Sequence, residues 1–233
     1  MITIQMYRMK KAILLSFFIF IGFTSLLAQS VKTDLSLKIS AAAAANRAQL
    51  ASYVWTRTVQ VFIGGVLKNT IVSSLSIGPD GKMVTTAVSS TPTDPPPTKG
   101  IRGDIARKKI GEMKTYVDNA VLVSASYIYM NKGNMLNYVD AAAISQSGNI
   151  ITINGSNVLH TGDQLTMILA QTSLKYVSEN FKSVVSNGDA IAGTVNYKTF
   201  DNGLTAINNA EFDLPAKNMK LMVSNSNYAK KLQ

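Results

Sequence analysis

The feature that most constrains the fold is a run of three segments, between residues 53 and 89, in which apolar and polar side chains alternate. A period of two residues is typical of a half-buried β-strand, because successive side chains point to opposite faces of a sheet. Gly64-Gly65 and the sequence Pro79-Asp80-Gly81 separate the segments and favour tight turns. We therefore expect three consecutive antiparallel strands in this part of the chain.

The same alternation returns in the last third of the sequence. The sequences Asn187-Gly188-Asp189 and Asp201-Asn202-Gly203 indicate turns there, because Asn, Asp and Gly tolerate positive φ. No segment repeats at a fixed period, which argues against a solenoid or a propeller. The strands expected in this region cover residues 150–153, 164–170, 174–185, 190–199, 205–214 and 219–228.

Helical patterns occupy two other places. Residues 40–51 are rich in Ala, the best helix former, and Ser40 is a suitable N-cap. After a Pro-rich boundary at residues 90–103, apolar residues recur every three to four positions from Asp104 to about Tyr129, and a shorter helix is expected over 135–144. We expect one α+β domain at 29–233 with a helical insert at about 104–146. Its sheet would be an incomplete antiparallel β-barrel, a curved open sheet of about eight or nine strands, with a helical lid.

The N-terminus has the pattern of a secretory signal at residues 1–28. Arg8, Lys10 and Lys11 are followed by an apolar run of 16 residues that ends before Ala28. This run is shorter than the ~20 residues that span a bilayer as a helix, although an uncleaved anchor is the alternative interpretation. Cleavage after Ala28 would remove three basic residues and lower the net charge from +10 to +7. With no Cys to carry a lipid, the sequence predicts a periplasmic protein without a lipid anchor.

Composition argues against most catalytic classes. The chain has no Cys and one His, which leaves no thiolate site and makes a His-rich metal site improbable. A hydrolase would have to pair His160 with Asp163 and a serine, yet no Gly-x-Ser-x-Gly motif accompanies them. We therefore expect no enzyme, no metal and no cofactor. Export also removes nucleic acid as the obvious partner of this basic chain.

Two stretches near the C-terminus resemble known exported proteins. Residues 162–169, Gly-Asp-Gln-Leu-Thr-Met-Ile-Leu, continue to Tyr176-Val177 and resemble a strand pair of outer-membrane lipoprotein-sorting proteins. Residues 211–217 and 223–228 resemble the ending of exported bacterial proteins of that kind. The resemblance implies the Lol-type carrier fold, shared with RseB-type periplasmic sensors, in which helices cover an apolar cavity. The carriers place a basic residue at the cavity mouth, and Arg57 is the nearest equivalent position here.

Two sets of side chains are candidate contacts. An open sheet with many strands has more apolar surface than two modest helices cover, which favours a ligand cavity between them. A basic cluster before and along the long helix favours contact with anionic lipid head groups or an acidic partner, although a solvated helix face is the plainer interpretation. The expected cavity lining is Tyr53, Trp55, Arg57, Val59, Leu67, Ile71, Met113, Val117 and Leu165. The expected anionic contacts are Arg102, Arg107, Lys108 and Lys109.

Three functions remain open at this point. The first is a monomeric carrier that buries a lipid, an acyl chain or a lipidated protein without covalent chemistry, with peripheral contact to a membrane. The second is a sensor or scaffold that binds another envelope protein through a strand edge or the basic helix. The third is a hydrolase that uses His160.

Overall fold

The computed structural model describes residues 32–93 and 100–231, with the backbone alone at 100–102. The expected signal at 1–28 and residues 94–99 of the Pro-rich loop lie outside this part of the chain. Within the described residues, no helix combines the length and the apolar character needed to cross a membrane.

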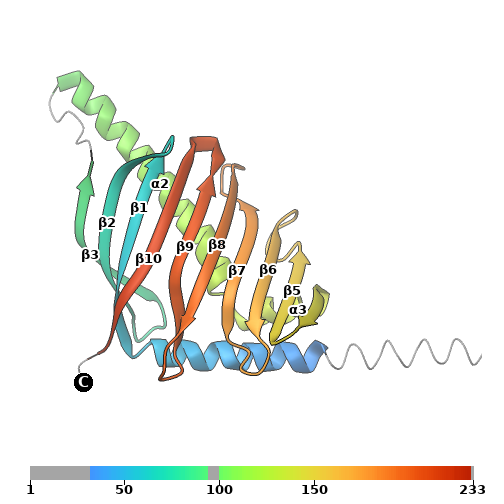
Figure 1. Ribbon diagram of the computed structural model, residues 1–233. Coiled ribbons are helices and arrows are strands. Elements are labelled where there is room, and N and C mark those ends of the chain that lie inside the picture. The colour runs from blue at the N-terminus through green and yellow to red at the C-terminus, as the bar shows by residue number, and fades with distance from the viewer. Residues whose placement is uncertain (1–31, 94–99, 232–233) are drawn as a thin grey trace, which may run out of the picture.

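Ten strands form one sheet in which every neighbouring pair is antiparallel (Figure 1). Their order across the sheet is β3-β2-β1-β10-β9-β8-β7-β6-β5-β4. The strands are β1 (Tyr53–Ile63), β2 (Val66–Ile77), β3 (Met83–Pro92), β4 (Ala143–Ser147), β5 (Ile150–Ser156), β6 (Gln164–Ala170), β7 (Tyr176–Val184), β8 (Ala190–Thr199), β9 (Thr205–Leu214) and β10 (Met219–Lys230).

The strand order follows from two meanders. Strands β1 to β3 run from the middle of the sheet to one edge, and the chain then crosses through helices to the opposite edge. Strands β4 to β10 return one by one, so that β10 pairs with β1. Because β3 and β4 stand at opposite ends of the order, the sheet is open. The expected class, an α+β fold with an open antiparallel sheet and a helical lid, is confirmed, with ten strands where eight or nine were expected.

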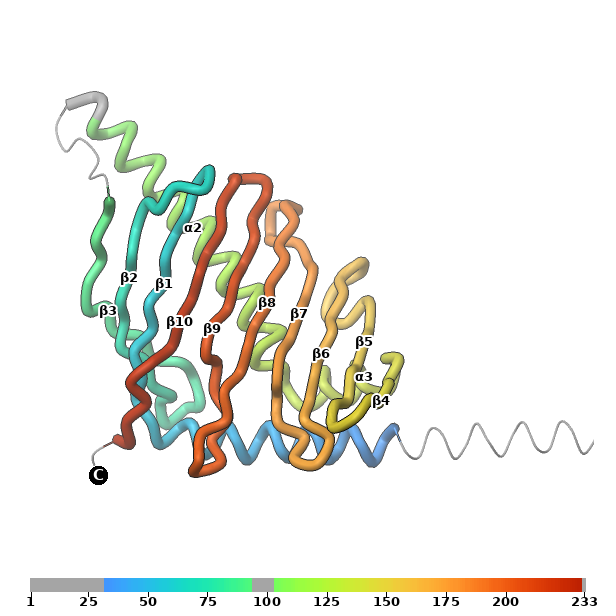
Figure 2. Tube along the Cα trace, viewed as in Figure 1, coloured from blue at the N-terminus to red at the C-terminus, as the bar shows by residue number. Residues whose placement is uncertain are grey.

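Three longer helices accompany the sheet. The crossing connection is made by α2 (Gly100–Ile128) and α3 (Lys132–Ala141), and a short 3₁₀ turn, η1 (Pro215–Lys217), joins β9 to β10. Figure 2 shows α2 running diagonally across one face of the sheet, while the helix at residues 32–50, here called the N-terminal helix, lies along the lower ends of the strands. The side chain of Asn131 caps α3 by accepting a 2.9 Å hydrogen bond from the amide of Asn134.

The N-terminal helix is longer than its Ala-rich pattern indicates. Ser40, expected as the N-cap, lies inside the helix and is buried, because helical residues precede it from residue 32. The helix is held to the strand ends by Asn46, whose side chain bonds both backbone groups of Thr205, donating to the carbonyl at 2.7 Å and accepting from the amide at 2.8 Å. The helix thereby closes one end of the space over the sheet.

Strand β4 is the element that the sequence pattern missed. Helix α3 ends at Ala141, and an extended Ala142 leads into β4, where the Ala-rich sequence favoured helix as far as Ile144. The strand is short, stands at the sheet edge and pairs only with β5. Four of its five side chains are exposed, so it carries no burial alternation that a sequence reader could detect.

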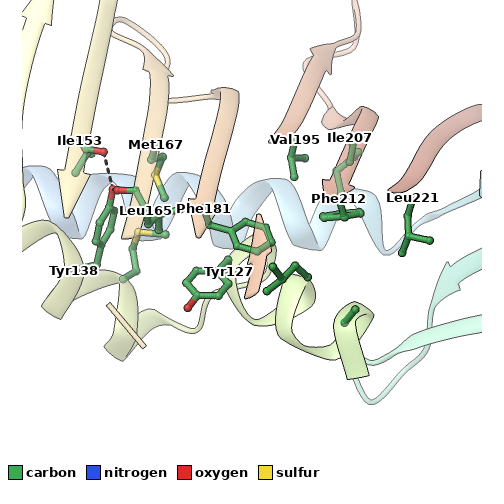
Figure 3. Packing of buried hydrophobic residues seen from close by; sticks show 14 of the residues in the cluster. Tyr127, Tyr138, Ile153, Leu165, Met167, Phe181, Val195, Ile207, Phe212 and Leu221 are labelled. Carbon is green, nitrogen blue, oxygen red and sulfur yellow. Dashed lines mark hydrogen bonds between the residues drawn. The ribbon is translucent and has the colours of Figure 1, made fainter. Parts of the chain in front are cut away.

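The core lies between the helices and one face of the sheet (Figure 3). Tyr127 of α2 stacks on Phe181 of β7 with ring centroids 4.7 Å apart. The hydroxyl of Tyr138 on α3 donates to the carbonyls of Ile153 and Leu165, at 2.6 and 3.1 Å. Because these contacts gather over β5 to β8, the helices are anchored at that end of the sheet.

Candidate ligand-binding cavities

A cavity lies between α2 and the part of the sheet that β1, β2, β9 and β10 form. We call it the α2 cavity; its volume is about 220 Å³. Apart from Arg57, Asp118, Ser124 and Tyr129, its lining is entirely apolar. The lining residues are Arg57, Val59, Ile71, Val117, Asp118, Val121, Ser124, Ala125, Ile128, Tyr129, Ile207, Ala210, Phe212, Leu221 and Val223.

The divergence of α2 from the sheet makes this space. Tyr116, Ala120, Ser124 and Tyr127 are buried, which fixes the later turns of the helix on the sheet. On these same turns Val121, which lines the cavity, is 47% exposed. The α2 cavity therefore reaches solvent along this edge of the helix.

A second cavity lies next to the first and is lined on one side by the N-terminal helix. We call it the tryptophan cavity because it is lined by Trp55, the single tryptophan of the chain; its volume is about 210 Å³. It lies between the N-terminal helix, the α2–α3 junction and strands β1 and β7 to β10. Ile128, Tyr129 and Ile207 line both cavities, so the two are neighbours separated by these side chains.

Polar groups concentrate in and behind the tryptophan cavity. Trp55 is 2% exposed and stacks on Tyr228, with centroids 5.7 Å apart, yet its indole Nε1–H has no hydrogen-bond partner within the described residues. At the junction of the two cavities, Nε of Arg57 donates a 3.2 Å hydrogen bond to Oδ1 of Asn225. Burial raises the pKa of Tyr129, and the guanidinium of Arg57 acts in the opposite direction.

Glu179 of β7 is a carboxyl group on the apolar face of the sheet. It is 1% exposed, and its Oε2 accepts a 2.7 Å hydrogen bond from the hydroxyl of Tyr197, a residue that lines the tryptophan cavity. Its Oε1 has no partner in the described part of the chain. Burial raises the pKa of Glu179 to about 8, although the hydrogen bond from Tyr197 acts to lower it. The side chain therefore keeps its proton in most molecules at pH 7.

The structure brings five of the nine expected lining residues to these cavities. Arg57, Val59, Ile71 and Val117 line the α2 cavity, and Trp55 lines the tryptophan cavity. The other four line neither of them. Tyr53 is buried and its hydroxyl accepts from Nδ2 of Asn202, Leu165 is core, and Leu67 and Met113 are half-buried.

The sequence analysis missed the polar members of the site. Glu179 lies on the same strand face as Phe181, so the alternation of β7 already places a carboxyl on an apolar face. Asn225 and Arg47 gave no such signal, because their approach to the cavities depends on the pairing of β10 with β1 and on the docking of the N-terminal helix.

The expected anionic contacts lie near the start of α2. Arg107 forms an ion pair with Asp104, and Lys108 and Lys109 are exposed. Arg102 belongs to the helix, but its side chain lies outside the described residues. The cluster is therefore placed on the exposed part of α2, ahead of the α2 cavity.

Asp163 and His160, the two residues that a hydrolase would pair, interact through the backbone amide of His160. Asp163 is buried and accepts hydrogen bonds from the hydroxyl of Tyr127 and from the backbone amides of Val158, Leu159 and His160. The His160 side chain is exposed. Burial acts to raise the pKa of Asp163, but these hydrogen bonds lower it below its ordinary value. The carboxylate thus organises the loop, and among the described residues no cluster of His, Asp and Glu has the arrangement of a metal site.

The sequence matches no described protein family and no curated protein. Two solved structures are similar in fold. A DUF1329 family protein from Desulfovibrio piger is 8% identical, with a TM-score of 0.40 over 87% of this chain and 93% of that one. A LolA superfamily protein from Nitrosomonas europaea is 10% identical, with a TM-score of 0.35 over 85% of this chain and 94% of that one.

The expected Lol-type fold stays a prediction. Similarity of this degree carries no argument about function. The fold class rests on the strand order and on the helices that cover one face of the sheet.

Proposed function

We propose that this protein is a carrier that binds one alkyl or acyl chain, of a lipid or of a lipidated protein, between its sheet and α2. The observation that supports the proposal is the α2 cavity, a mostly apolar space of about 220 Å³ between α2 and the sheet. Removal of apolar area from water stabilises a complex by ~25 cal/mol per Å². Affinity would therefore come from burial of the chain, without covalent chemistry.

The lid in this proposal is α2. Its buried residues hold the later turns on the sheet, while its earlier turns expose Ile105 and Ile110, at 52% and 50%. The part of α2 that lines the α2 cavity runs from Val117 to Ile128, so a movement that opens the cavity has to include these later turns, along the edge where Val121 is exposed. We propose further that the protein acts in the periplasm as a monomer, following removal of the signal at residues 1–28.

Two variants of α2 test the carrier function. Ala125 lines the α2 cavity, whereas the neighbouring Ser126 is exposed and does not. Ala125→Phe fills the cavity and should weaken binding of palmitic acid at least tenfold, while Ser126→Phe should bind as the parent protein does. Circular dichroism checks that both variants fold. Equal binding by the two variants, or protein purified from its own envelope that native mass spectrometry always finds free of lipid, would refute the proposal.

A second candidate function is binding of another envelope protein along β3. Nine of the ten residues of this edge strand are exposed, including Val84 and Val88 at 47% and 67%. The backbone groups on the outer side of such a strand can pair with a strand from a partner. Val84→Lys and Val88→Lys should then abolish capture of the partner, whereas Trp55→Ala should not. Loss of capture in the Trp55 variant alone would assign the interaction to the cavities instead.

A further inference from the structure

Trp55 has a buried hydrogen-bond donor that lacks an acceptor within the described residues. The indole Nε1–H has no hydrogen-bond partner within the described residues, although the side chain is only 2% exposed. Leaving a buried donor unpaired costs about 1–3 kcal/mol. Trp55 lines the tryptophan cavity but Nε1 itself has almost no accessible surface, so an acceptor atom of a bound molecule would remove this cost once the side chains around the ring move to admit it.

The charges around this cavity have one sign. Arg47 and Lys132 line it, and among the residues described no carboxylate does. The nearby Glu179 lies behind Tyr197 and is held neutral by its burial. A guanidinium and an ammonium without a carboxylate among the lining residues favour an anionic group in the space between them.

The α2 cavity has the opposite character. Its walls are apolar apart from four side chains, and of these Arg57 is already bonded to Asn225 and Asp118 to Lys114. The two cavities share Ile128, Tyr129 and Ile207, so one elongated molecule would occupy both if these side chains move apart. The tryptophan cavity thus favours a polar, anionic group, and the α2 cavity favours an apolar chain.

We propose that the tryptophan cavity holds the anionic head group of a single-chain amphiphile, with Nε1 of Trp55 donating to a head-group oxygen and the alkyl chain lying in the α2 cavity. This inference rests on the proposed carrier function and adds the class of ligand and its direction. The head group is a carboxylate or a phosphate, both of which offer oxygen acceptors. Arg47 and Lys132, exposed at the rim, would neutralise its charge.

The fluorescence of Trp55 tests the direction, because no other tryptophan contributes to the signal. One stearic acid carries a nitroxide quencher near its carboxyl end and another carries it near its methyl end. At equal occupancy the first should quench Trp55 several-fold more than the second. Stronger quenching by the methyl-end label would overturn the proposed direction while leaving the carrier function intact.

Affinity measured by titration calorimetry tests the head group. Palmitic acid and hexadecyl phosphate should each bind about tenfold more tightly than hexadecanol, a difference of about 1.4 kcal/mol; whichever acid binds more tightly indicates the source of the anion. Trp55→Phe keeps a ring against Tyr228 but removes the donor, and it should reduce the preference for the acids, as should Arg47→Gln. Lys182→Gln, an exposed position on β7, is the matched control and should change nothing.

The outcomes separate the two proposals. Equal affinity for the acids and the alcohol, unchanged in both variants, would refute the head-group site and keep the carrier function. Absence of binding by all three amphiphiles would refute both.

Discussion

The hydroxyl of Tyr197 donates a 2.7 Å hydrogen bond to Oε2 of Glu179 on the covered face of the sheet. Burial raises the pKa values of Tyr176 and Tyr138, and Glu179 raises them further once it is ionised. A cluster of tyrosines around one neutral carboxyl group is polar without being charged. It provides a hydrogen-bonding wall behind the tryptophan cavity at neutral pH.

This arrangement predicts that the protein loses stability as the pH rises. The pKa of Glu179 is about 8 in the folded protein against an ordinary value of 4.5, so between these values the folded state keeps a proton that the unfolded state releases. The free energy of unfolding should fall by about 1.4 kcal/mol per pH unit through this window from this group alone, and level off above the folded pKa.

Urea unfolding of the parent protein and of Glu179→Gln at several pH values from 5 to 9 measures this slope. The glutamine cannot ionise, so its curve should lack the decrease due to position 179. Glu112→Gln, at an exposed position on α2, should retain it. Parallel curves for the parent protein and Glu179→Gln would show that Glu179 does not hold its proton in the fold.

A close contact inside the sheet predicts the effect of adding one methyl group. A Cβ atom on Gly193 of β8 would lie 2.2 Å from Cε1 of Phe181, the ring that stacks on Tyr127. Because the ring of Phe181 is buried and stacks on Tyr127, Gly193→Ala should destabilise the protein by about 1–3 kcal/mol. Gly111→Ala on α2 meets no atom within 4 Å and should instead stabilise by up to about 1 kcal/mol. Thermal melts check both signs, and a neutral Gly193 variant would mean that the ring can move aside.

The loop that Asp163 organises should depend on its charge. Asp163→Asn replaces one acceptor oxygen by a donor among groups that already donate, and should cost about 2 kcal/mol or more. Because the folded pKa of Asp163 is lowered, this stabilisation is present above its ordinary value of 3.8 and is lost as the pH falls through the folded value. Denaturant unfolding at neutral pH measures the loss. Asp140→Asn, exposed on α3, is the control and should be neutral.

The exposed basic residues of α2 should attach the protein to anionic membranes. Lys108→Ser combined with Lys109→Ser should lower partitioning onto vesicles that contain phosphatidylglycerol by about tenfold, and added salt should weaken the parent protein in the same way. Vesicle sedimentation gives the partition coefficient. The exposed pair Lys182→Ser and Lys198→Ser removes the same charge elsewhere, so an equal loss in that variant would indicate an effect of net charge alone.

Most strands could be placed from the sequence because each carries a complete local signal. The alternation of β1 and β2 and the glycines at positive φ, such as Gly64 and Gly65, depend on neighbouring residues only. Strand β4 was not predicted because most of its side chains are exposed, so its sequence shows no alternation of apolar and polar residues. The N-terminal helix was expected too short because its Ala-rich part is only one portion of it.

By itself the sequence determined the strand segments, their turns and the helical crossing, since these follow from periodicity and turn chemistry over a few residues. Only the tertiary structure decided that β10 pairs with β1, which brings Arg57 to Asn225, 168 positions later, at the junction of the two cavities. Such pairing joins segments that are far apart in the chain, so no pattern over a few residues specifies it. The neutral state of Glu179 and the unpaired donor of Trp55 are likewise products of burial by distant segments, which no local pattern encodes.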